Sequence, residues 1–279
     1  MDKKILGLLL VIIIASGCTG PNSNGDSDED EGPELASDRG LQIKTFRSTD
    51  ETLRPSQPAV LNLVLKNYHT EDFSIEEISI YNEGDLTVEN KSCTPEIGEL
   101  GLASGSSYPE MQCQWDMEAP PESYYDNFDS KPASVNLHLE YESSLTNEEP
   151  FKVEFKPLDE INASSDISKT FSNSEISMSV ETEDPVPRES GRTVEVSAKE
   201  IGQGRLASDS SYEFDFVPDS IFGDDCDREE SPVVGNEVEF SCGIGQSGEV
   251  QEGTRNLVFS TYYKYVKEPI LNVKLVNNQ

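Results

Sequence analysis

The chain has 279 residues, 54 of them acidic and 21 basic, and a net charge of −33. This charge repels nucleic acid and anionic lipid surfaces, so the composition excludes polyanionic partners. The acidic residues are spread along nearly the whole chain, which favours halophilic adaptation, where salt screens self-repulsion, over specific cation binding.

The N-terminal residues have the pattern of a secretory signal. Two lysines precede an apolar run from Ile5 to Ile14, which is shorter than an ordinary membrane span. Three small residues then lead to Cys18. The segment from Ile14 to Cys18 resembles the lipobox of prokaryotic lipoproteins, with Ala15 at the position where Leu is commonest. The resemblance implies a signal peptide over 1–17, cleavage before Cys18 and lipidation of Cys18; an uncleaved N-terminal anchor is the alternative.

Residues 18–40 are predicted to be a disordered acidic linker. From Thr19 to Gly40 the sequence holds seven acids against one Arg and almost nothing apolar, so it cannot bury a core. Its expected role is to hold the folded part away from the membrane. Together these features place the bulk of the chain outside the cytoplasm, anchored to the outer face of the cell membrane.

From Leu41 onward, apolar residues recur with a period of two. Short alternating runs broken by Pro, Gly, Asn and Ser predict half-buried antiparallel strands. No sustained helical pattern follows the signal, and Ile97 to Leu100 is expected to be either a strand end or a single turn. The predicted strands include residues 61–65, 78–80, 135–141, 153–155, 194–196, 212–216, 238–240, 257–259 and 273–275.

The chain also repeats itself with an offset of 133 residues. This offset separates Val60 from Thr193, each of which enters a strand, and Cys93 from Cys226. Each unit later has an Asn-Leu pair, tyrosines, a Glu-Pro pair and a final strand. The prediction is an all-β fold with two tandem immunoglobulin-like antiparallel β-sandwiches. Their predicted bounds are 41–158 and 172–279, joined by a linker over 159–171.

The first unit carries a family resemblance. It reads Val60-Leu-Asn-Leu-Val-Leu-Lys-Asn67, then Ile97-Gly-Glu-Leu-Gly-Leu-Ala-Ser-Gly105, then a Trp-bearing strand and a closing strand with Tyr141. This order resembles the CARDB-type and related adhesion-like modules of archaeal and bacterial surface proteins. The resemblance covers about 41–145, favours an archaeal source and implies a role as spacer or interaction domain. The cysteine pair departs from the family, and the second unit lacks the Ile-Gly-x-Leu segment.

Four cysteines remain once Cys18 is assigned to lipid, and they form two close pairs. An even number of paired cysteines outside the cytoplasm predicts disulfides, each tying a long loop to the strand after it. A four-thiolate metal site is the alternative, although the chain lacks the Cys-x-x-Cys spacing. Trp115 is expected on the same face as the nearby cysteine two residues before it. The predicted disulfides are Cys93–Cys113 and Cys226–Cys242.

One acidic loop is the best candidate for a metal site. Calcium takes 6–8 oxygen ligands, and a loop held by the second disulfide could supply them. A solvated acidic loop without a metal is the alternative. The candidate ligands are Asp219, Asp224, Asp225 and Asp227.

Other polar residues carry weaker signals. Asn90 and Asn162 begin N-glycosylation patterns, and both are expected in loops. His69 and His138 are the only histidines; neither falls in a catalytic motif, and both are expected at the surface.

The sequence does not predict an enzyme. It has no phosphate loop, dinucleotide fingerprint or unpaired nucleophilic cysteine. The leading hypothesis is a membrane-anchored extracytoplasmic lipoprotein that acts as a surface stalk or protein-interaction module. Its expected partners are the membrane, through the lipid, and other cell-envelope proteins, with no cofactor. The alternative is a solute- or cation-binding lipoprotein, with Ca²⁺ as the candidate cation.

Overall fold

The computed structural model describes residues 40–207, 212–223, 226, 237–245 and 250–277. Within these ranges the chain is all-β, as predicted, and most neighbouring strands pair antiparallel. Its helical segments there are three short 3₁₀ turns, and no helix in the described residues is long and apolar enough to span a membrane. The first half comprises β1 (Leu41–Ser48), β2 (Thr52–Leu53), β3 (Pro58–Asn67), β4 (Ser74–Asn82), β5 (Thr87–Thr94), β6 (Glu110–Glu118), η2 (Glu122–Tyr125), β7 (Ser130–Thr146) and β8 (Phe151–Lys156). The second half comprises η3 (Leu158–Glu160), β9 (Ser165–Ser172), β10 (Ile176–Asp184), β11 (Val186–Pro187), β12 (Arg192–Glu200), β13 (Arg205–Leu206), β14 (Glu213–Val217), η4 (Asp219–Ile221), β15 (Glu237–Ile244), β16 (Gly253–Lys267) and β17 (Ile270–Val276).

Burial follows the alternating sequence pattern. On β3, residues 59, 61, 63, 65 and 67 are buried while their neighbours are exposed or half-buried. On β6, Met111, Cys113, Trp115 and Met117 are buried and every intervening residue is exposed. Trp115 therefore shares a face with Cys113, as predicted. Residues 97–98 form a turn, so the segment from Ile97 to Leu100 is a single turn rather than a strand end.

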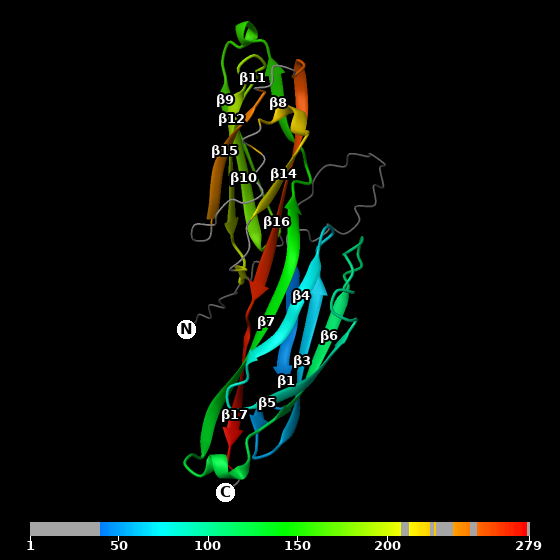
Figure 1. Ribbon diagram of the computed structural model, residues 1–279, viewed down its shortest axis with the longest axis vertical. Helices are drawn as coiled ribbons and strands as arrows, with labels where there is room; N and C mark the ends of the chain where they lie inside the picture. The colour runs from blue at the N-terminus through cyan, green and yellow to red at the C-terminus, as the bar shows by residue number, and fades with distance from the viewer. Residues whose placement is uncertain (1–39, 208–211, 224–225, 227–236, 246–249, 278–279) are drawn as a thin grey trace, which may run out of the picture. The chain divides into compact units, whose positions relative to one another are not determined.

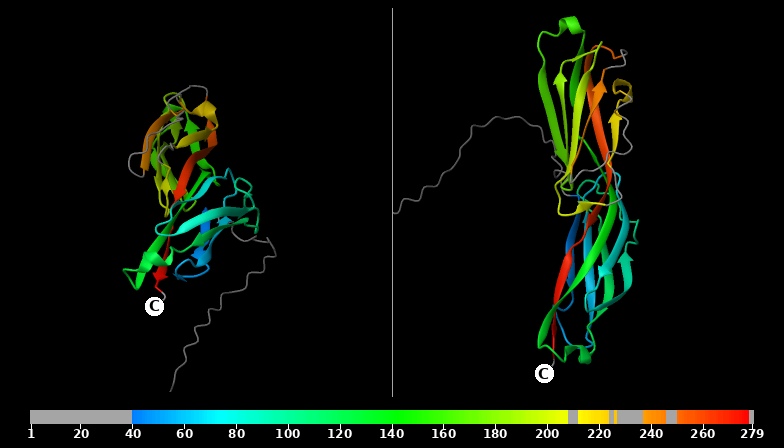
Figure 2. Two further views of the ribbon diagram at one scale, coloured as in Figure 1. Left: turned by 60° about the horizontal axis from the view of Figure 1, so that its bottom comes forward. Right: turned by 60° about the vertical axis from the view of Figure 1, so that its left-hand side comes forward.

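Two sandwiches are built from three sheets (Figures 1 and 2). In the first sandwich, the sheet β1-β3-β6-β5 packs against β4, β7 and β17 of a nine-stranded sheet. In the second, the sheet β15-β12-β10-β9 packs against β8, β16 and β14 of that same sheet. The nine-stranded sheet therefore contributes one layer to each sandwich.

The two repeats exchange their last strands. Along the chain, β8 follows β7 in the first repeat and β17 follows β16 in the second. In the structure, β8 pairs with residues 253–257 of β16, and β17 pairs with residues 130–136 of β7. The C-terminal halves of β7 and β16 pair with each other, from Thr146↔Ser260 to Leu139↔Lys267 (Figure 1). Each sandwich is thus completed by the closing strand of the other repeat.

This exchange crosses the boundary predicted from the sequence. The predicted units 41–158 and 172–279 divide the chain between β8 and β9, and a strand crosses that division in each direction. Whether either unit folds alone remains a prediction. The segment 159–171 is not merely a linker, because most of β9 lies within it and pairs with β10. An edge strand with only Ile167 and Phe171 as apolar residues alternates too weakly to be recognised in the sequence.

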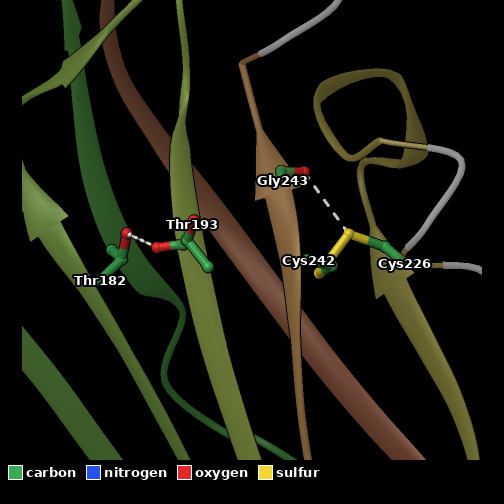
Figure 3. The surroundings of a disulfide bond; sticks show 5 residues. All are labelled: Thr182, Thr193, Cys226, Cys242 and Gly243. Atoms are coloured by element: carbon green, nitrogen blue, oxygen red, sulfur yellow. Dashed lines mark hydrogen bonds between the residues drawn. A yellow bond between two sulfur atoms is a disulfide. The ribbon is translucent and has the colours of Figure 1, made fainter.

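The structure contains both predicted disulfides. Cys93 and Cys113 lie directly opposite each other on the antiparallel strands β5 and β6, rather than between a loop and a strand as expected. Cys226 lies outside the strands and bonds to Cys242 on β15, which matches the expected loop-to-strand arrangement (Figure 3). The carbonyl of Gly243 lies 3.4 Å from Cys226 Sγ. Each bridge therefore attaches to a strand that pairs with a central strand: β6, which pairs with β3, and β15, which pairs with β12, the counterpart of β3.

Replacing Cys93 and Cys113 together with alanine should lower the free energy of unfolding by about 3 kcal/mol. The sequence separation of 20 residues means that the bridge restricts the unfolded chain substantially. Urea unfolding of the oxidised parent and the double variant measures this difference. A parent that loses no stability on reduction would contradict the prediction.

Candidate functional site

A buried carboxylate lies where the two sandwiches meet. Glu175 occupies the turn between β9 and β10, and its side chain is 1% exposed. Asn173 shapes this turn: its Oδ1 accepts hydrogen bonds from the backbone N–H groups of Glu175 and Ile176, both at 3.2 Å. Such Asx hydrogen bonds stabilise tight turns locally. The turn thereby aims the carboxylate of the second repeat into the first.

Both oxygens of Glu175 receive donors from distant parts of the chain. Oε1 accepts from the backbone N–H of Leu41 at 3.0 Å and from the hydroxyl of Tyr141 at 2.6 Å. Oε2 accepts from the hydroxyl of Tyr263 at 2.9 Å. Lys267 Nζ lies 3.8 Å from Oε1 and also donates to the carbonyl of Leu41. Strands β1, β7 and β16 are therefore joined at one side chain.

The approach to this carboxylate leaves no room for a larger residue at position 40. Gly40 has φ +52°, and a Cβ atom there would overlap Glu175 Oε1. Glycine is therefore required both by the positive φ and by the close approach.

His69 completes the buried cluster. Its Nε2 lies 3.3 Å from Glu175 Oε1, and its ring stacks on Phe73 with centroids 5.1 Å apart. The residue is 6% exposed, so the prediction of a surface histidine is wrong here. The reason is that β3 runs directly into the junction, where Asn67 Oδ1 accepts from the His69 backbone N–H at 3.0 Å. His138 is half-buried on β7, and its ring nitrogens lie near carboxylate oxygens of Glu140 and Glu268.

Ser143, His69 and Glu175 have the residue types of a hydrolase triad, but their geometry is unsuited to nucleophilic catalysis. Ser143 Oγ lies 3.2 Å from His69 Nδ1 and 3.4 Å from Nε2. At nearly equal distances it aligns with the lone pair of neither nitrogen. Ser143 is 2% exposed and Glu175 already accepts several hydrogen bonds. The arrangement satisfies buried polar atoms and holds the junction together.

The surroundings of Glu175 keep it ionised. Burial acts to raise its pKa, but the charge and hydrogen bond of His69, the charge of Lys267 and the hydrogen bond of Tyr141 outweigh this and hold the pKa at about 2. Burial and the neighbouring charge of Glu175 raise the pKa of Tyr141 and of Tyr263 well above the usual range. Both tyrosines therefore remain neutral hydrogen-bond donors to the carboxylate.

Acid should destabilise the protein through Glu175. Its folded-state pKa of about 2 lies below its ordinary value of 4.5, so the unfolded chain takes up the proton first. The stabilisation is fully present above pH 5 and is lost as the pH falls from about 4.5 to about 2, and its full size is about 3 kcal/mol. Urea unfolding of the parent and of Glu175→Gln at successive pH values measures it. A variant with the same pH dependence as the parent over this range would refute the assignment.

Two grooves flank the cluster. The first has a volume of about 470 Å³ and lies beside His69, Asn147 and Asn173, with Phe171 and Lys169 on its wall; we call it the Asn147 groove. The second has a volume of about 670 Å³ and is lined by residues from β4, β7, β14, β16 and two loops; we call it the Tyr262 groove. Its lining includes Asp72, Phe73, Leu102, Glu142, Glu213 and Tyr262. Neither groove was predicted from the sequence.

The residues predicted as sites lie elsewhere. Cys18, Asp224, Asp225 and Asp227 are outside the described residues, and Asp219 begins η4. In the described part of the chain, no group of three or more His, Cys, Asp or Glu side chains is arranged to hold a metal ion.

The two predicted glycosylation sites are both exposed. Asn162 lies in the loop after η3, as expected. Asn90 lies within β5 rather than in a loop, at a register shift between Glu89 and Ser92, and its Nδ2 donates to Asp116 at 3.0 Å. The irregular pairing explains how an exposed asparagine with φ 54° occurs inside a strand.

Comparisons with known proteins leave the chain without an assigned family. No family model matches it, and no curated protein matches it. Among solved structures, the collagen adhesin CNA from S. aureus is 8% identical, with a TM-score of 0.18, over 87% of this chain and 94% of that chain. The Enterococcus faecalis MSCRAMM ACE, which binds its ligands by the collagen Hug model, is 8% identical, with a TM-score of 0.17, over 84% of this chain and 95% of that chain. These identities and TM-scores are too low to support a shared fold or function. The all-β assignment rests on the sheets described above.

Proposed function

We propose that the protein is a lipid-anchored, extracytoplasmic protein-interaction module. The observation that carries this proposal is the Glu175 cluster, which joins strands of both repeats and lies between two open grooves. A pair of sandwiches that share strands and have grooves at their junction is suited to binding a partner rather than to spacing alone. The two disulfides agree with an oxidising compartment outside the cytoplasm.

The charge of the protein indicates what kind of partner it takes. A net charge of −33 attracts proteins with basic surfaces and repels acidic ones, and it accelerates association with the former. A solute- or cation-binding role, with calcium as the cation, is the alternative; within the described residues no cluster of His, Cys, Asp or Glu side chains is arranged to hold a metal ion.

Site-specific cross-linking in the native envelope tests this function. A photoreactive phenylalanine analogue at Leu102, which is 43% exposed beside the Tyr262 groove, should capture an envelope protein. The same analogue at Lys199, an exposed position on β12, is the control and should capture none. No adduct from Leu102, or equal adducts from both positions, would reject a partner at this junction. Adducts that form only with calcium would instead favour the cation-binding alternative.

The proposed anchor makes a separate prediction. Intact mass spectrometry of membrane-extracted protein should show loss of residues 1–17 and the added mass of acyl chains on Cys18. Two or more chains are expected, because one acyl chain binds membranes only marginally. Replacing Cys18 with serine should release the protein from the membrane fraction. A mature chain that retains Met1 would contradict the lipoprotein assignment.

A further inference from the structure

The Tyr262 groove combines an apolar and aromatic lining with carboxylates at its margin. Leu102 is 43% exposed, and Phe73 and Tyr262 are half-buried, so each presents apolar surface at the groove. The groove is formed where β14 and β4 reach the central strand pair, with Glu213 opposite Tyr262 and Ser74 opposite Glu142. Side chains from both repeats therefore line one volume of about 670 Å³.

Two of the carboxylates at this groove have no cationic partner in the part of the chain that the structure describes. Four charged side chains line it: Asp72, Glu142, Glu213 and Lys264. Lys264 Nζ lies 3.3 Å from Glu142 Oε1, so these two neutralise each other. Neither Asp72 nor Glu213 forms an ion pair within the described residues. The groove therefore keeps two negative charges that no cation among the described residues compensates.

The negative potential is evident at the Tyr262 ring. Burial and the charges of Asp72, Asp215, Glu213 and Glu71 raise the pKa of the Tyr262 hydroxyl. The same carboxylates would attract any cation that enters the groove. It would also lie near aromatic rings, whose faces attract cations.

We propose that the Tyr262 groove binds a lysine or arginine side chain presented by the protein partner. This inference rests on the proposed function and names the chemistry of the group bound. A long basic side chain has an apolar stem and a charged end. The stem would pack on Leu102, Phe73 and Tyr262, and the charged end would lie between Asp72 and Glu213.

Peptide binding to the full chain tests this assignment. The probe is a fluorescein-labelled Gly-Ser peptide that contains two arginines and two lysines, and its matched analogue has glutamine at those four positions. We expect anisotropy to show that the basic peptide binds at least tenfold more tightly than the glutamine analogue. Replacing Asp72 with asparagine and Glu213 with glutamine together should weaken binding of the basic peptide at least tenfold. Asparagine tolerates the positive φ of 26° at position 72, so the variant should fold.

A second double variant separates the groove from the general charge of the protein. Glu195→Gln with Glu239→Gln also removes two negative charges, but from exposed positions on β12 and β15 of the second sandwich. Binding should change less than twofold in this control. Tyr262→Ser keeps the net charge and should still weaken binding several-fold, because it removes the aromatic wall. Equal losses in the two double variants, or equal binding of both peptides, would overturn the proposal.

The two proposals can fail separately. If Leu102 captures an envelope protein but the basic peptide does not bind, the interaction function stands and the assignment of a basic side chain is wrong. If the peptide binds in the groove but no envelope protein is captured, the groove recognises cations and the proposed partner function fails. Failure of both measurements would leave the junction with neither role.

Discussion

Replacing Glu175 with glutamine should lower the free energy of unfolding by about 3–5 kcal/mol. The substitution keeps the size of the side chain but removes a charge whose surroundings are built for it. Lys267, 17% exposed, would lose the carboxylate 3.8 Å away, and the hydroxyls of Tyr141 and Tyr263 would face a weaker acceptor. Chemical denaturation of the two proteins at pH 7 measures the loss.

A surface ion pair provides the matched control. Glu149 lies 3.0 Å from Lys169, a shorter distance than in the buried pair, but its side chain is 88% exposed. Solvent screens such pairs, so Glu149→Gln should cost far less stability than Glu175→Gln. Similar losses for the two substitutions would show that Glu175 is not an essential contact between the repeats.

A double variant identifies the origin of the loss. In Glu175→Gln with Lys267→Met, no buried ammonium is left without a counter-ion, and the apolar stem of residue 267 keeps most of its packing. The double variant should therefore be more stable than Glu175→Gln alone. A strictly additive loss would indicate that the hydrogen bonds from the tyrosines and Leu41, rather than the ion pair, account for the effect.

The strands could be predicted from the sequence because the alternation of apolar and polar residues within each strand shows which face is buried. Residues 61–65 and 135–141 alternate apolar and polar side chains, and the structure buries the apolar face of each. The disulfides were predictable because close cysteines have few possible partners. The strand half of the 133-residue offset corresponds to structure, since Val60 lies near the start of β3 and Thr193 near the start of β12. The cysteine half does not, because Cys93 lies on β5 whereas Cys226 lies outside the strands.

The exchange of strands and the Glu175 cluster could not be predicted in this way. Periodicity shows that β8 and β17 are strands but carries no information about which repeat they complete. Glu175, His69 and Lys267 are far apart in sequence, and each looks like an ordinary polar residue of an acidic surface protein. One weak signal was present: Gly40 directly precedes β1, and glycine there marks a close approach of the backbone.

Cutting the chain between the repeats should leave one complex rather than two proteins. A site for a sequence-specific protease between Asn162 and Ala163 lies in an exposed loop after η3, so cleavage there breaks no strand. The fragments would still share five strand pairs: three antiparallel ones, β7 with β16 over residues 139–146, β8 with β16 over 151–155 and β17 with β7 over 270–276, and two short parallel ones, β2 with β17 and β8 with β11. The cleaved protein should therefore elute from a size-exclusion column at the position of the intact chain and separate only in denaturant.

The exchanged strands make this result informative about the fold. If each repeat closed its own sandwich, as the bounds 41–158 and 172–279 assume, the cleaved protein would dissociate into two folded fragments. If the exchange holds, a fragment isolated from its partner exposes apolar residues such as Val135 on β7 or Leu257 on β16, because the strand beside them belongs to the other fragment. Shortening the cleaved protein by residues 270–279 removes β17 and with it two of the five strand pairs, those with β7 and β2. This truncated complex should dissociate at a higher protein concentration than the full cleaved complex, whereas independent sandwiches would show no such difference.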